Sequence, residues 1–96
     1  MADRLRSMSL ERLTRPFPPY ASRAAAALAL AQQLADTALD LEGLPRRPVP
    51  DVGPLAVGDQ VAVTGEDLAA AAYSLPEPTP SVTGCLEAMA ELRRAL

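Results

Sequence analysis

The chain has 96 residues, room for one small domain, and 49% of them are apolar but only 3% aromatic, so leucine, valine and alanine must build the core. Its net charge of -3 argues against nucleic acid as a partner. All of its basic residues are arginine. The absence of histidine and the single cysteine exclude Ser-His-Asp and Cys-His arrangements, the usual zinc sites and an internal disulfide.

Residues 1–19 predict an N-terminal arm, either a short helix or a disordered segment, that ends in a proline cluster. Its apolar residues follow helical spacing poorly, so we expect the arm to be loosely attached to a single domain at residues 20–96. The arm is locally positive because it carries four arginines, Arg4, Arg6, Arg12 and Arg15. Salt bridges with Asp3 and Glu11, or disorder, are one interpretation, and contact with phosphate or an acidic partner is the other.

Residues 20–42 predict the first main helix, rich in alanine, leucine and glutamine, with a stop at Gly43 and Pro45. Two leucine ridges separated by alanines suit a central helix that packs against two others. The apolar run 24–31 resembles the core of a secretory signal, but Asp3, Glu11 and the nearby prolines argue against that interpretation. No segment has the roughly 20 apolar residues of a membrane-spanning helix, so we expect a soluble, cytoplasmic protein without membrane contact.

Residues 44–54 hold four prolines and predict an extended connector. Within it, Pro45-Arg46-Arg47-Pro48 matches the proline pattern that aromatic-lined grooves recognise, which makes Arg46 and Arg47 candidate partner contacts. A plain link between helices explains the same residues.

Residues 55–75 allow two interpretations. A helix would place Val57, Val61 and Leu68 on one stripe, with Pro54 in its first turn. A strand at residues 61–63, followed by a turn near Gly65 and a helix, is the alternative. We favour the helix.

Residues 80–96 predict the last helix, which begins after the N-cap Thr79. Cys85 falls on its apolar stripe, so we interpret it as a core residue rather than as a thiol activated by the helix dipole. The three stripes together predict an all-α fold, a small three-helix bundle with helices near 20–42, 55–75 and 80–96.

Candidate chemistry is sparse. Asp36 and Asp40 share a helix face and suit a cation, but a solvated polar face explains them equally well. The glycines match no phosphate-binding loop, and no residue set indicates a cofactor. We therefore expect a non-catalytic helical interaction module, an accessory subunit, adaptor or small regulator that binds a protein partner or itself.

Two other hypotheses remain open. A DNA-associated regulator, such as an antitoxin-like dimer, would use the arginines of the arm for phosphate contact. An enzyme site completed by a partner chain would take Asp36, Asp40 or Glu66 from this chain as its carboxylate.

Overall fold

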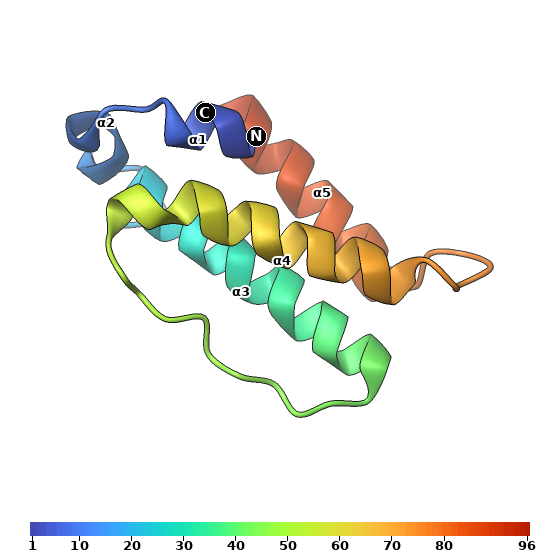
Figure 1. Ribbon diagram of the computed structural model, residues 1–96. Coiled ribbons are helices and arrows are strands. Elements are labelled where there is room, and N and C mark those ends of the chain that lie inside the picture. Colours follow the sequence, from blue (N-terminus) through green and yellow to red (C-terminus); the bar gives the residue numbers. More distant parts are fainter.

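The computed structural model describes residues 1–96 and confirms an all-α fold (Figure 1). The elements are α1 (Ala2–Arg6), α2 (Leu10–Thr14), α3 (Arg23–Glu42), a short 3-10 helix η1 (Pro54–Ala56), α4 (Val57–Ala72) and α5 (Pro80–Ala95). The three long helices correspond to the three that the sequence predicts. None of the helices combines the length and the hydropathy that crossing a bilayer requires.

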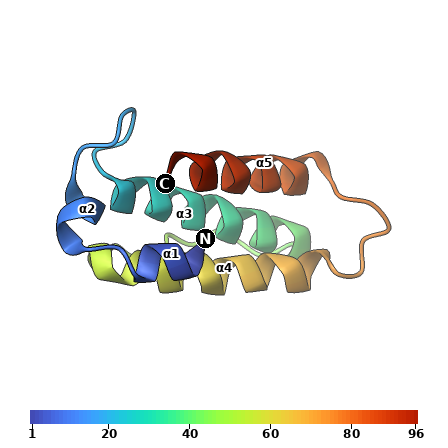
Figure 2. The same cartoon turned by 90° about the horizontal axis from the view of Figure 1, so that it is seen from above.

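Helix α3 is the central helix of the bundle, with α4 on one side and α5 on the other (Figures 1 and 2). It begins where the side chain of Ser22 accepts a hydrogen bond from the Ala25 N–H at 3.0 Å. It ends at Gly43, whose φ of 70° is the left-handed conformation that glycine adopts most readily. Ala27 and Ala31 are fully buried on the faces of α3 that its neighbours cover, which confirms the central position predicted for this helix.

The middle of the chain is helical, and the strand alternative for residues 61–63 is overturned. Val57, Val61 and Leu68 are all at most 5% exposed and face α3 from α4. Thr64 is buried on the same stripe, and its hydroxyl donates to the Gln60 carbonyl at 2.7 Å. The burial of four residues at helical spacing outweighs the local β propensity of the two valines.

Helix α5 begins at Pro80 after the N-cap Thr79, whose side chain accepts a hydrogen bond from the Val82 N–H at 3.3 Å. Cys85 is fully buried, and its sulfur lies 3.2 Å from the Thr37 hydroxyl of α3. The thiol is therefore part of the contact between α5 and α3, as its place on the apolar stripe predicts.

The N-terminal arm differs from the expectation of a loosely attached segment, because it packs firmly on the bundle. Leu5 is 2% exposed and Leu13 is 1% exposed, and Met8 is also buried. The arm contains two five-residue helices separated by residues 7–9, and Ser9 is the N-cap of α2. Its apolar residues thus belong to two helices of different direction, which is why they do not follow one helical period.

The connector at residues 44–53 has no regular secondary structure and crosses the groove between α3 and α4 as an ordered strap. The Gln32 side chain of α3 holds it at two points, donating to the Arg47 carbonyl at 3.1 Å and accepting from the Val49 N–H at 2.7 Å. Gln60 of α4 donates to the Pro50 carbonyl at 2.7 Å. The connector is extended, as predicted, and fixed to both helices.

Candidate docking groove

Three of the four arginines of the arm, Arg4, Arg6 and Arg12, fix the arm to the bundle. Arg4 and Arg12 both donate to the Leu96 carbonyl oxygen, the latter at 3.0 Å, and so satisfy a main-chain acceptor at the end of α5. Arg15 pairs with Glu11 of its own helix at 2.9 Å. These contacts are intramolecular, so the exposed guanidinium groups that form them each have an acceptor within the chain.

Arg6 connects α1 to α4. Its guanidinium lies 2.6 Å from the Asp59 carboxylate and 3.0 Å from that of Asp3, and hydrogen bonding to Asp59 raises the pKa of Arg6 above its usual value. The ion pair spans the two helices where they approach most closely. The main chain of α1 lies directly over Gly58, since a methyl group there would be 3.1 Å from the Ala2 carbonyl oxygen.

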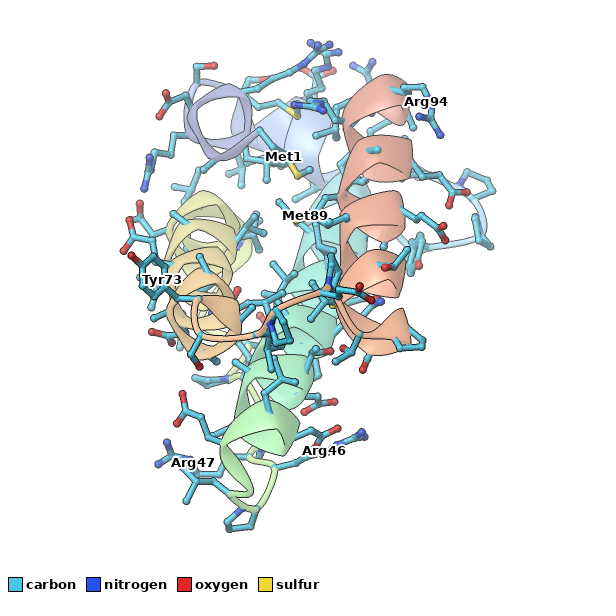
Figure 3. All side chains as sticks on the ribbon, turned by 90° about the vertical axis from the view of Figure 1, so that its right-hand side faces the viewer. Met1, Arg46, Arg47, Tyr73, Met89 and Arg94 are labelled. Atoms are coloured by element: carbon cyan, nitrogen blue, oxygen red, sulfur yellow. The ribbon has the colours of Figure 1, made fainter.

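Arg46 and Arg47 lie at the opposite end of the molecule from Arg94 and the arm (Figure 3). Arg46 forms a two-pronged hydrogen bond with the Asp40 carboxylate at 2.7 and 3.0 Å, which lowers the pKa of Asp40. It also lies 3.7 Å from Asp36. Both carboxylates of the candidate cation pair therefore face a guanidinium, and nowhere in the chain do three metal-binding side chains gather.

The remaining candidates are exposed. The side chain of Arg47 forms no ion pair, and both prolines of the Pro45–Pro48 pattern are exposed on the strap. Glu66 is exposed on α4 and also has no ion-pair partner. The six candidate arginines thus divide between the two ends of the bundle, and only Arg4 and Arg12 converge on one atom.

An apolar groove of about 430 Å³ lies between the loop after α2, helix α3 and helix α5. One wall is α3, with Ala26, Ala29 and Leu30, and the opposite wall is α5. The α5 wall presents Ala88, Glu91, Leu92 and Ala95. Most of these side chains are small, so a helix laid along the groove would approach both walls closely.

The end of the groove is closed by the turn Phe17-Pro18-Pro19-Tyr20, which holds two of the three aromatic residues of the chain. The Tyr20 N–H donates to the Phe17 carbonyl at 2.8 Å, and the Pro18–Pro19 peptide bond is cis. The Arg23 guanidinium stacks on the Phe17 ring at 4.9 Å from its centre. The ring is therefore fixed from one side and lines the groove from the other.

Helix α5 carries charges of both signs near the groove, and of these Glu91 lines it. Glu87 and Glu91 are exposed in the middle of the helix, and Arg94 is exposed in its last turn. None of the three forms an ion pair with another residue of the chain. The groove thus combines an apolar floor with one unpaired carboxylate, that of Glu91, and an apolar centre with a polar border is the general anatomy of a protein-binding surface.

Sequence reasoning missed this groove. The one local signal was the pair of aromatic residues around two prolines, which reads as a helix-breaking cluster when it is considered alone. A comparison with protein-family models matches no family, and comparisons with curated proteins and with solved structures find no similar chain.

Proposed function

We propose that the protein is a non-catalytic interaction module that binds a helix of another polypeptide in the groove between the Phe17–Tyr20 turn, α3 and α5. The observation that carries the proposal is the apolar groove of about 430 Å³, whose α5 wall includes the unpaired carboxylate of Glu91. The apolar floor supplies burial, and the charges select orientation.

The charges define the chemistry of the bound helix. Arg94 lies near the closed end of the groove, and Arg23 lies over Phe17 at the same end. Glu87 lies on the same face of α5 as Arg94, about two turns toward the open end, and Glu91 is the charged residue of α5 that lines the groove. A helix that fits has small apolar residues on its buried face and a basic residue that meets Glu91 on the α5 wall.

A substitution on the α3 wall tests the proposal. Gln33 is exposed and lines the groove, so Gln33→Arg adds a long charged side chain there without disturbing the core. Ala69→Arg adds the same side chain at an exposed position of α4 outside the groove and serves as the matched control. Each tagged variant and the natural chain are used to capture proteins from the native host.

At least one captured protein should be retained by the natural chain and by Ala69→Arg and lost with Gln33→Arg. A helical peptide of that protein should then bind the purified chain and lose affinity with Gln33→Arg. Identical captured sets for all three chains would refute docking in the groove. Capture that disappears steeply as salt rises, together with bound nucleic acid, would instead support the DNA-associated alternative.

A further inference from the structure

The strap between α3 and α4 contains a proline segment whose backbone conformation is restricted by its own sequence. Pro45, Pro48 and Pro50 have a fixed φ, and each of them disfavours the helical conformation for the residue before it. Of the strap residues up to Pro50, only Arg46 is free of both restrictions. Residues 45–52 form no hydrogen bond between main-chain groups, which is a property of the polyproline II helix. The segment therefore has the constraints of a polyproline II ligand.

The contacts of the strap with the bundle follow the period of three residues that a polyproline II helix has. Arg46 is paired with a carboxylate of α3, and Val49, three residues later, is half-buried and packs against the core. These two side chains define the inner side of the strap. Because residues three apart share a side, Pro45 and Pro48 lie together on a second side and Arg47 lies on the third. All three of these residues are exposed.

The strap is held in its extended form by side chains of the bundle. Gln32 donates to the Arg47 carbonyl at 3.1 Å and accepts from the Val49 N–H at 2.7 Å, and Gln60 donates to the Pro50 carbonyl at 2.7 Å. An isolated peptide loses conformational entropy when a partner orders it. In this chain the bundle has already ordered the segment, so a partner binds it at a lower entropic cost.

Arg47 is the charge of the strap that the chain leaves unpaired. Arg46 is bonded to Asp40, whereas Arg47 forms no ion pair, although the carboxylates of Glu42 and Asp67 line the same hollow of about 520 Å³ between the strap and the two helices. Pro48 also lines this hollow, so the strap stands clear of the helices there and its prolines can be approached from the side.

We propose that the strap is a second docking surface, independent of the helix-binding groove. It is a preformed polyproline II ligand for a domain with an aromatic-lined groove that is bordered by carboxylates. The aromatic rings of the partner pack on the side of the strap that carries Pro45 and Pro48, which are roughly 9 Å apart along its axis. A carboxylate beside the groove pairs with the guanidinium of Arg47 on the adjacent side.

The probe for this surface is a purified SH3 domain whose aromatic groove is bordered by carboxylates, added to the isotope-labelled full chain. Binding should shift the amide signals of the strap with a dissociation constant below about 1 mM. Arg47→Glu should raise this constant by about tenfold or more, because it replaces an attractive ion pair by a repulsive one. The double variant Pro45→Ala, Pro48→Ala should abolish binding. Pro78→Ala, at an exposed proline in the loop between α4 and α5, should leave the constant unchanged.

Absence of strap shifts at about 1 mM probe would overturn the proposal. Shifts confined to other parts of the chain, or binding that Arg47→Glu and the double proline variant leave unchanged, would overturn it as well. The amide spectrum of each variant also shows whether it is folded, so a loss of binding cannot be confused with unfolding. The test is separate from that of the groove: Gln33→Arg should bind the probe as the natural chain does, and loss of the probe with this variant would place the contact in the groove and refute a second surface.

Discussion

Alanine substitution at two glycines of α4, Gly58 and Gly65, should change the stability of the protein in opposite directions. Gly65 lies in the helix with no atom within 4 Å of the position where a methyl group would be added. Gly65→Ala should therefore stabilise the protein by about 0.5 to 1 kcal/mol, because alanine loses less backbone entropy in a helix. Gly58 lies beneath α1, where the same methyl group would be 2.9 Å from Arg6 Cγ and 3.2 Å from the Arg6 main-chain nitrogen.

Helix α1 must move if Gly58 gains a side chain. The flexible Arg6 side chain could turn aside, but two main-chain atoms of α1 would also be too close to the added methyl group. The Ala2 carbonyl oxygen at 3.1 Å and the Arg6 nitrogen belong to the main chain of α1. Overpacking of this kind costs about 1 to 3 kcal/mol, which exceeds the gain of at most about 1 kcal/mol in helix propensity. We expect Gly58→Ala to destabilise the protein by about 1 kcal/mol.

Urea and thermal unfolding of the two variants at one protein concentration provide the measurement. A change of about 1 kcal/mol shifts the melting temperature by about 4 to 8 °C in a domain of this size, so the two variants should move to opposite sides of the natural chain. Equal stabilisation by both alanines would show that α1 is not seated on α4, and the packing of the arm would have to be rejected.

Three further predictions concern the arm, the cysteine and the strap. Leu5→Ala should cost about 2 to 5 kcal/mol in urea unfolding, whereas Leu10→Ala, at a residue that is 52% exposed, should cost far less; similar small losses would indicate a detached arm. Cys85 should react with a thiol reagent only as fast as the protein unfolds, and rapid native labelling would contradict its burial. Arg46→Ala should raise the pKa of Asp40 toward its ordinary value in an NMR titration, because the guanidinium that favours the carboxylate is removed; an unchanged pKa would exclude the ion pair in solution.

The ion pair between Arg46 and Asp40 also makes the stability of the protein depend on pH in a definite direction. Because the pKa of Asp40 is lower in the folded protein, its contribution is present above the unfolded value and is lost as the pH falls through the folded value. The pair is exposed to solvent, so the effect is small and confined to acidic pH.

The long helices were predictable because their ends are encoded locally. Gly43 terminates α3 through its own backbone conformation, and Thr79 with Pro80 starts α5 through a cap and a fixed φ. The choice of helix over strand for residues 57–72 rested on the burial stripe, which is also a property of the segment itself. Such signals can be recognised without knowing which other segments of the chain pack against these helices.

The packed arm was not predictable in this way. In the sequence alone, Gly58 is a residue that lowers helix propensity. In the structure it leaves room for the main chain of α1, a segment more than fifty residues away in the sequence. Arg4 and Arg12 look like a basic patch until the end of α5 supplies the carbonyl that they share. In both cases the contact joins distant segments, and neither half carries a local sign of the other.

The groove depends on the arm for the same reason. Arg23 stacks on Phe17 and also donates to the Arg12 carbonyl at 3.4 Å, so the turn that closes the groove is attached to α2. Leu13, on α2, is among the most buried side chains of the chain. A chain that lost the packing of α2 would therefore lose the Arg12 carbonyl that helps to hold the Arg23 guanidinium over the Phe17 ring. The proline cluster thus joins the arm to the groove, whereas its sequence suggests that it separates the arm from the domain.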